Sequence, residues 1–407
     1  MQGSLIVQKY GGSSVANIDR IKSVAERIAR YRKKGHSLVV VVSALGDTTD
    51  ELMQLAHGIT SLPSERELDM LISTGEQVSV ALLAMAMHKK GIDAISFTGA
   101  QVGIITDRSH TKARIIDVSA DRIKKALKQG KVVIVAGFQG VNLDQEITTL
   151  GRGGSDMTAV ALAATLKASV CEIYTDVEGV YTADPRVVKD AQKLSCVSYE
   201  EMLELASLGA QVMQARSMEV AKKFSVPLHI RSSFSNKAGT IISKEVKAME
   251  DVLVSGIAAD KKEAKVTICD VPDRPGVAAR IFRDLADNNI NVDMIIQNIS
   301  RTGCTDVSFT MPVEESVRAR QVIQRIVKDV KAKEVIYNRN IAKISIVGIG
   351  MRSHSGVAAK MFEALASKKI NIDMISTSEI KISCVIDKKR SQDAVKTLHQ
   401  AFKLGKK

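Results

Sequence analysis

The stretch Leu38-Val-Val-Val-Val42 is apolar at every position. A continuous apolar run of this length, rich in β-branched residues, predicts a strand that is buried on both faces, as in a parallel sheet. The same signal returns at 131–136 and at 170–175. Between these runs lie longer stretches without Gly or Pro, such as 18–34 and 158–167, which favour helices. Alternation of this kind predicts an α/β domain with a mostly parallel sheet covered by helices.

The C-terminal part of the chain contains an internal repeat. Residues Asp273–Ile295 align without a gap, at an offset of 80, with Ser353–Ile375, and twelve of the 23 aligned positions are identical. Each copy has the pattern of a strand, a Gly-containing turn, a helix, two strands and a second helix. The repeat therefore predicts two small α+β modules.

The two modules are not equally complete. In the first we expect strands near 264–271, 292–299, 304–311 and 334–337, and helices near 276–289 and 314–329. The second ends with a helix at 391–402 and lacks the last strand, which leaves a sheet edge open. We expect the unassigned stretch 252–258 to supply it, so that the first module is inserted in the second. The predicted domains are 1–245, 262–338, and 252–261 joined to 339–407.

Composition excludes several classes of function. A chain of 407 residues is too long for a single core. The net charge of +13 suggests nucleic-acid binding, but the basic residues alternate with acidic ones along the helical stretches. Trp is absent and aromatic residues make up 3%, so a stacking platform for single strands is lacking. We therefore expect no nucleic-acid partner and prefer a basic surface suited to small anionic substrates.

The sequence also argues against membrane and secretory classes. We find no apolar stretch that approaches the ~18 residues of a membrane span, and the first residues do not resemble a secretory signal. The five cysteines are odd in number and scattered, which is typical of reduced thiols. We expect a cytoplasmic protein without a membrane partner.

Three polar segments follow predicted strands. Lys9-Tyr-Gly-Gly-Ser-Ser14 can bring backbone amides and a lysine close to an anion, although by itself it is more typical of a tight turn with a surface lysine. Gly151-Arg-Gly-Gly-Ser-Asp156 precedes a helix expected to start near Met157, with Ser155 or Asp156 as N-cap; it suits an anion clamp or a simple capped turn. Thr175–Arg186 leaves the end of a strand, where open α/β sheets bind their ligands.

Together these segments resemble the aspartate kinases of the amino-acid kinase superfamily. The resemblance rests on Lys9–Ala16, Val42–Leu52, Ser73–Gln77, Gly151–Ala159 and Thr175–Arg186, and it extends over essentially the whole chain. It implies an αβα sandwich followed by two βαββαβ modules of the ACT type. It also implies ATP-dependent phosphorylation of the side-chain carboxylate of L-aspartate, the first step toward lysine, threonine and methionine.

The chemistry of this reaction agrees with the residues present. A carboxylate is already ionised at neutral pH and needs no general base to attack a phosphoryl group. What remains is to position two anions and to neutralise the charge between them. The resemblance assigns Lys9 to the γ-phosphate, with the Gly11 and Gly12 amides beside it and Asp156 orienting Lys9.

The resemblance also assigns the two substrate sites. Arg152 is expected to pair with the α-carboxylate of aspartate and Glu76 to receive its α-ammonium, a combination that disfavours an N-acetylated substrate. The rest of the aspartate site comprises Ser43, Asp47, Thr48, Thr49, Gly153, Gly154 and Ser155. The ATP site comprises Lys9, Tyr10, Gly11, Gly12, Thr175, Asp176, Tyr181, Arg186, Gln211 and Val212. Many relatives have Lys at 211 and His at 214, where this chain has Gln. Mg²⁺ is expected to arrive with ATP, with no protein ligand assigned.

In the modules, the resemblance implies feedback inhibition by lysine, threonine or both. The expected effector residues are Asp273, Gly276, Val277, Ala278, Asn291, Val292, Asp293 and Gln297 in the first copy, and Val357, Asn371 and Ile372 in the second. Because Ser353-His-Ser355 replaces Asp273-Arg-Pro275, the two sites are expected to differ in ligand, or one of them to be vestigial.

Several alternatives remain open at this stage. The assembly is either a homodimer through the ACT modules or an α₂β₂ complex with a subunit that starts internally at Met249. The modules could serve dimerisation alone. The runner-up functions are another carboxylate kinase, such as glutamate kinase, and a catalytically silent amino-acid sensor, against which the retention of Lys9, Glu76, Arg152 and Asp156 argues.

Overall fold

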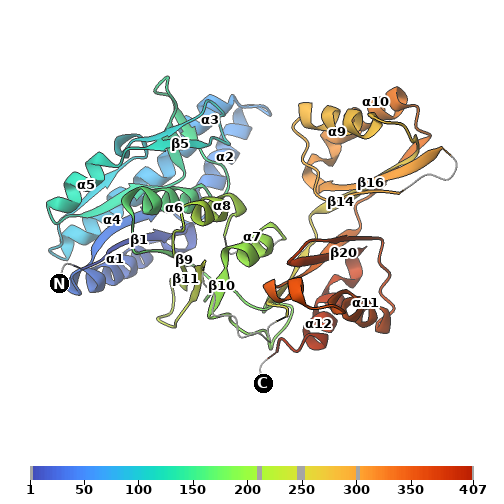
Figure 1. The fold of residues 1–407 in the computed structure, drawn as a ribbon. Helices are drawn as coiled ribbons and strands as arrows, with labels where there is room; N and C mark the ends of the chain where they lie inside the picture. The colour runs from blue at the N-terminus through green and yellow to red at the C-terminus, as the bar shows by residue number, and fades with distance from the viewer. Residues whose placement is uncertain (1–2, 209–212, 245–252, 299–302, 406–407) are drawn as a thin grey trace. The chain divides into compact units, whose positions relative to one another are not determined.

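The computed structural model describes residues 3–208, 213–244, 253–298 and 303–405. They divide into two compact units (Figure 1). The first unit contains residues 3–181, Lys193–Ser207 and 213–244. The second contains Thr182–Gln192 and the chain from 253 onward.

An eight-stranded sheet forms the centre of the first unit (Figure 1). The strand order is β10 (Cys196–Ser198), β12 (Thr240–Ser243), β11 (Leu228–Ser232), β9 (Val170–Thr175), β1 (Leu5–Tyr10), β2 (Ser37–Val42), β6 (Val132–Ala136) and β3 (Ala94–Phe97). Every neighbouring pair is parallel except β11 with β12. The three strands predicted from apolar runs are confirmed as β2, β6 and β9, and the mostly parallel α/β fold with them.

Side chains alternate between the two faces of each strand, so β1 presents Tyr10 to one face and Lys9 to the other. Tyr10, Val40 and Ile134 belong to one core cluster with residues of α1 (Ile18–Lys33) and α4 (Thr74–Lys89). Because successive side chains of a strand point to opposite faces, Lys9 points to the other face. There it meets α6 (Gly154–Leu166), whose first ten residues are all buried.

The first unit also contains a smaller, four-stranded sheet. It has the order β5 (Ile115–Val118), β4 (Ile104–Thr106), β7 (Gln139–Val141) and β8 (Ile147–Thr149). The remaining helices of the unit are α2 (Thr48–Ile59), α3 (Glu65–Ile72), α5 (Asp121–Lys128), α7 (Tyr199–Ser207) and α8 (Ala215–Lys223). This region was not assigned from sequence, because its strands are only three or four residues long.

The stretch Glu65–Lys89, which includes α3 and α4, corrects the expectation that no apolar stretch approaches the length of a membrane span. Its 25 residues are long and apolar enough, by composition, to cross a membrane. However, half of its most apolar segment is buried inside the protein, and a helix of a protein core can have the same length and composition. Val80, Leu83 and Met87 of α4 indeed pack in the main core cluster.

The second unit contains the two repeated modules. The first has the sheet β15 (Ile295–Gln297), β16 (Cys304–Pro312), β14 (Glu263–Pro272) and β17 (Glu334–Asn338), with α9 (Val277–Asp287) and α10 (Ser316–Val330). The second has β13 (Gly256–Asp260), β18 (Ile341–Val347), β20 (Lys381–Asp387) and β19 (Met374–Thr377), with α11 (Val357–Ser367) and α12 (Ser391–Ala401).

Strand β13 precedes the first module in sequence but lies in the sheet of the second. It pairs antiparallel with β18, from Gly256 opposite Val347 to Asp260 opposite Lys343. This pairing is the one that the inserted arrangement requires. Of the stretch expected to form this strand, Val252 lies outside the described residues, as does Met249.

Candidate active site

The carboxyl ends of β1 and β2 meet the start of α6. Lys9 Nζ lies 2.6 Å from Asp156 Oδ1, and both side chains are nearly buried. Ser43, directly after β2, donates a hydrogen bond of 3.0 Å from its Oγ to Ser155 Oγ. Four residues predicted from three separate motifs are thus brought together, with a lysine ammonium held at the N-terminus of a helix, where anions bind favourably.

Two glycines allow the backbone to approach this lysine. A Cβ on Gly11 would lie 3.5 Å from Lys9 Nζ, and a Cβ on Gly12 would lie 2.9 Å from the carbonyl oxygen of Gly46. The Gly46 amide in turn donates to the Gly12 carbonyl. Any side chain at Gly12 would therefore push the two loops apart.

Glu76 lies in the first turn of α4 and is 2% exposed. Its Oε1 accepts a hydrogen bond of 3.1 Å from the Ala44 amide, just after β2. Its Oε2 is buried and has no hydrogen-bond partner. Burial raises the pKa of this carboxyl group to about 7, against the hydrogen bond from Ala44. A buried carboxylate oxygen without a donor is what a cationic ligand group requires.

The start of α6 differs from the sequence expectation. The helix begins at Gly154 rather than near Met157, and its N-cap is Gly153, at φ 74°. Ser155 and Asp156 do not cap it, because their side chains contact Ser43 and Lys9 instead. Arg152 precedes this turn and is exposed, and within the described part of the chain its side chain has no ion pair or hydrogen bond.

The remaining predicted residues lie at the start of α2, at or after the end of β9, or outside the described residues. Thr48 approaches Gly75, with 3.6 Å between its Cγ2 and a Cβ placed on that glycine, while Asp47 and Thr49 lie beside it at the start of α2. Thr175 ends β9, and its hydroxyl donates to Asp176. Tyr181 bridges to Lys193 in the first unit, whereas Arg186 belongs to the second unit and pairs with Asp184 at 2.9 Å. Gln211 and Val212 lie outside the described residues.

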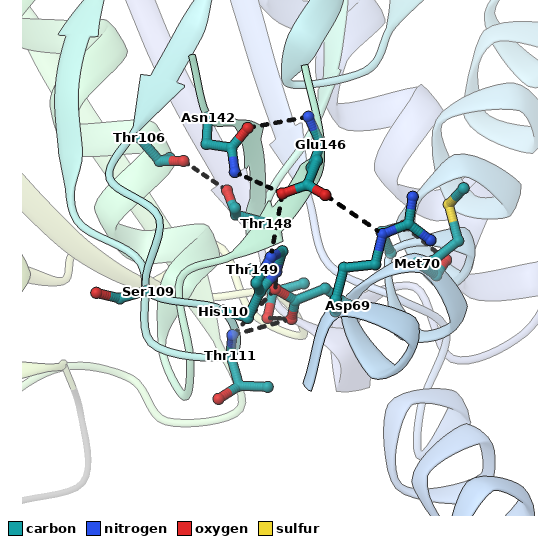
Figure 2. Close-up of polar contacts among 12 residues, drawn as sticks. Asp69, Met70, Thr106, Ser109, His110, Thr111, Asn142, Glu146, Thr148 and Thr149 are labelled. Carbon is teal, nitrogen blue, oxygen red and sulfur yellow. Dashed lines mark hydrogen bonds and ion pairs between the residues drawn. The ribbon is translucent and has the colours of Figure 1, made fainter. Parts of the chain in front are cut away.

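A second polar cluster, which sequence reasoning missed, links α3 to the loop around His110 and to β8 (Figure 2). Asp69 of α3 is completely buried and accepts hydrogen bonds from the Thr111 amide and, at 2.5 Å, from Thr149 Oγ1. His110 Nδ1 lies 2.9 Å from Asp69 Oδ2. The other ring nitrogen of His110 lies 3.6 Å from Glu146. A single Asp in an amphipathic helix and a single His in a loop form no sequence pattern, so no signal could have found them.

In the first module, a cavity of about 350 Å³ opens at the turn before α9. Of the predicted effector residues, those that line it are Asp273, Gly276, Val277, Ala278 and Gln297. Among the described residues the lining does not include Asn291, Val292 or Asp293. The carboxylate of Asp293 instead contacts Lys343 of β18, so the expectation that it faces the turn is corrected.

The equivalent turn of the second module leads into α11. Val357 is buried at the first position of this helix. Asn371 is exposed, and its amide lies 3.4 Å from Asp373. The two turns share a glycine N-cap in the left-handed region, Gly276 at φ 92° and Gly356 at φ 89°.

Comparison with known families agrees with this arrangement. A model described as the amino acid kinase family matches residues 4–232, and two models described as ACT domain match 265–330 and 344–402. The chain therefore belongs to the amino acid kinase family and carries two ACT domains after its kinase domain.

The individual relatives that the chain resembles are aspartate kinases. The aspartate kinase of Pseudomonas putida is 54% identical over 402 residues, which are 98% of either chain. The structure of E. coli aspartokinase III in complex with aspartate and ADP superposes with a TM-score of 0.83 at 25% identity, over 98% of this chain and 99% of that one. Its complex with lysine and aspartate gives 0.74 at the same identity and coverage. Within the amino acid kinase family, this chain is an aspartate kinase, an enzyme that phosphorylates the side-chain carboxylate of L-aspartate.

Proposed function

We propose that the Lys9–Asp156 pair and the buried Glu76 form the catalytic and substrate centre of this aspartate kinase. The observation that carries the proposal is the partnerless Glu76 Oε2, which lies in the turn of α4 that contacts the end of β2. An α-ammonium group there would give the buried oxygen a charged donor. Arg152, whose guanidinium is free of protein partners among the described residues, takes the α-carboxylate.

Recognition of a zwitterion follows from these two charges. Glu76 and Arg152 fix the backbone ends of aspartate, so its side-chain carboxylate is left for the reaction. Ser43, Ser155 and the start of α2 at Asp47, Thr48 and Thr49 complete this pocket. An N-acetylated substrate would leave Glu76 buried without a cationic partner, which selects against it.

Lys9 takes the γ-phosphoryl group of ATP. Its ammonium stands at the N-terminus of α6, oriented by Asp156, and a Cβ placed on Gly11 would lie 3.5 Å from it. Cation and amide dipoles there neutralise the charge that builds up between the two reacting anions. The rest of the nucleotide is assigned to Thr175, Asp176 and Tyr181 of the first unit, and Tyr10 contributes at most backbone groups because its side chain is buried in the core. The roles expected of Arg186, Gln211 and Val212 stay predictions.

Mg²⁺ fits this site only as a companion of the nucleotide. Within the described ranges no three His, Cys, Asp or Glu residues gather to hold a metal, and the carboxylate nearest Lys9, that of Asp156, is already paired. The ion supplies charge neutralisation on phosphate oxygens, and no protein ligand is assigned to it.

Steady-state kinetics of two variants tests the assignment. Lys9→Met is expected to lower kcat by roughly 10³-fold or more with a folded protein, because the transition state loses its main cation. Glu76→Gln is expected to raise KM for aspartate by at least about 100-fold and to leave KM for ATP within about twofold. The matched control Glu67→Gln, an exposed residue of α3, should change neither constant. Wild-type kcat in Lys9→Met would overturn the proposal.

For regulation, we assign the effector to the cavity at the first ACT turn. The amides at the start of α9 suit the carboxylate of an amino acid, and Gln297 lines the same cavity. Lysine and threonine are the candidate effectors; the E. coli relative was solved with lysine. Gln297→Ala should raise the inhibition constant of the true effector severalfold without changing uninhibited kcat, and an unchanged inhibition constant would refute this location.

The proposal includes the assembly and the domain limits. The kinase domain spans 1–245, the first ACT domain 262–338, and the second 252–261 with 339–407. The β13–β18 pairing supports this insertion. A cytoplasmic homodimer through ACT domains is proposed, with the α₂β₂ form as the alternative. Analytical ultracentrifugation of wild type and Met249→Leu separates them, since only α₂β₂ loses a subunit in the variant.

A further inference from the structure

The polar cluster around Asp69 places a carboxylate where burial is costly. Asp69 is 0% exposed and has donors from two separate elements, the Asp107–Ala113 loop and β8 (Figure 2). His110 continues the chain of contacts to Glu146, which accepts a hydrogen bond from Asn142 and lies 3.6 Å from Arg66. Hydrogen bonding from Asn142, with the nearby His110, holds the pKa of Glu146 below its ordinary value. The cluster thus alternates acidic and basic groups from α3 to the surface.

On one side, this cluster reaches the turn that carries Arg152. Thr149, which donates to Asp69, is three residues before Arg152, and its carbonyl accepts from the Ala113 amide at 2.9 Å. A Cβ on Gly151 would lie 3.1 Å from the carbonyl oxygen of Thr111. The loop that contains His110 therefore packs directly against the residue preceding Arg152.

On the other side, Asp69 reaches the helix that carries Glu76. The Asp69 carbonyl accepts a hydrogen bond from the Ser73 amide, and Ser73 is the N-cap of α4. The Ser73 carbonyl accepts, at 2.7 Å, from Gln139 Nε2 on β7, which pairs with Thr149 of β8. Asp69 is therefore hydrogen-bonded to the segments that precede both substrate-binding charges, through its backbone carbonyl to Ser73 and through its carboxylate to Thr149, although it lies in neither motif.

We infer that Asp69 and His110 are positioning residues that set the spacing between Glu76 and Arg152 and thereby the enzyme's affinity for aspartate. The inference rests on the proposed roles of Glu76 and Arg152. Asp69 joins the two elements, and His110, which donates through Nδ1, holds the loop against Gly151. ATP binding depends on β1 and β9, which the cluster does not touch among the described contacts. The expected signature is thus a selective change in KM for aspartate.

The experiment compares three substitutions of the same histidine in the full-length enzyme. Asn can place its amide near the Nδ1 position, whereas Gln places it near Nε2. His110→Asn should keep the donation to Asp69 and a KM for aspartate within about threefold of wild type. His110→Gln and His110→Ala should raise that KM by about tenfold or more, because a hydrogen bond to a charged group is lost. In all three, kcat and KM for ATP should stay within about twofold.

Arg108→Ala is the matched control. Arg108 lies on the same loop, is largely exposed and pairs with Asp144 at 2.7 Å, so its loss should leave all three constants unchanged. Thermal unfolding of each variant checks the fold. If His110→Ala does not fold, the comparison between the Asn and Gln variants still decides. Equal KM values for aspartate in those two variants, or parallel changes in both KM values, would overturn the inference.

Arg152→Ala separates this inference from the proposed site. If it raises KM for aspartate while the Gln and Ala variants of His110 remain at the wild-type value, the positioning role is wrong and the site assignment stands. If Arg152→Ala leaves KM unchanged, the assignment of Arg152 fails, and the inference that depends on it fails as well.

Discussion

Among single residues, Glu76 is the one at which the needs of stability and of substrate binding conflict most clearly. Its carboxyl group is buried on α4 with one oxygen unpartnered, and burial raises its pKa to about 7. The ionised form is the one that binds an ammonium group, yet the empty site disfavours it. Substrate recognition at this position therefore depends on pH within the neutral range.

The first prediction follows from that pKa. As the pH falls, a growing fraction of Glu76 is protonated and cannot pair with the α-ammonium, so KM for aspartate should rise by about tenfold in all between pH 8 and pH 6. Above about pH 8 KM should level off, since nearly all of the carboxylate is then ionised. Initial rates at varied aspartate between pH 6 and 8.5, at saturating ATP, measure this. A KM that is constant over the range would contradict the role of Glu76.

The second prediction concerns the stability of the ligand-free enzyme. Because the folded-state pKa of Glu76 lies above the unfolded value near 4.5, its contribution is most favourable below pH 4.5 and is lost as pH rises through 7. At pH 8 Glu76→Gln should therefore stabilise the kinase domain, by at most about 3 kcal/mol. Urea unfolding at pH 8 and pH 5 tests it; an equal effect at both values would refute the burial argument.

At the level of elements, the apolar runs predicted strands β2, β6 and β9, because a strand buried on both faces has an unmistakable composition. Lys9, Glu76 and Asp156 were found through motifs that end such strands or begin helices. The cap of α6 was predicted wrongly, since tertiary contacts engage Ser155 and Asp156. The Asp69 cluster was missed, because Asp69, His110 and Glu146 lie far apart in the sequence and meet only after folding.

The third prediction uses the turn before α6. Gly153 has φ 74°, and a Cβ there would lie 2.7 Å from Cβ of Gln214, whereas Gly130 has φ 76° with nothing within 4 Å. Gly130→Ala should lose only about 1 kcal/mol of stability, from backbone strain. Gly153→Ala should lose more and should also raise KM for aspartate, because the turn next to Arg152 must shift. Equal kinetic constants in both variants would show that this turn tolerates displacement.

At the scale of the whole molecule, the two repeated modules are connected by buried ion pairs as well as by the polypeptide chain. Lys343 of β18 is 3% exposed and contacts Glu263 and Asp293 of the first module. Burial lowers the pKa of Lys343, but the two carboxylates outweigh burial and raise it above its ordinary value. Met294 and Ile341 pack together beside these residues, so the modules of the second unit share one small core.

The fourth prediction is that Lys343→Met destabilises this unit. Removal of the ammonium leaves Glu263 buried without its cation, which should cost roughly 3 kcal/mol. Scanning calorimetry should show one unfolding transition moving to lower temperature and the other unmoved. Lys333→Met, which removes an exposed pair with Asp270, serves as the control and should move neither. A Lys343 variant with unchanged transitions would show that the triad contributes nothing net.

The most direct measurement of the central claim is a crystal structure of this enzyme with aspartate and a non-hydrolysable ATP analogue. We expect the α-ammonium at hydrogen-bond distance, about 2.8–3.0 Å, from Glu76 Oε2. We also expect the α-carboxylate on Arg152 and the terminal phosphate on Lys9. Aspartate bound with its ammonium away from Glu76, or a phosphate chain that does not reach Lys9, would contradict the assigned site.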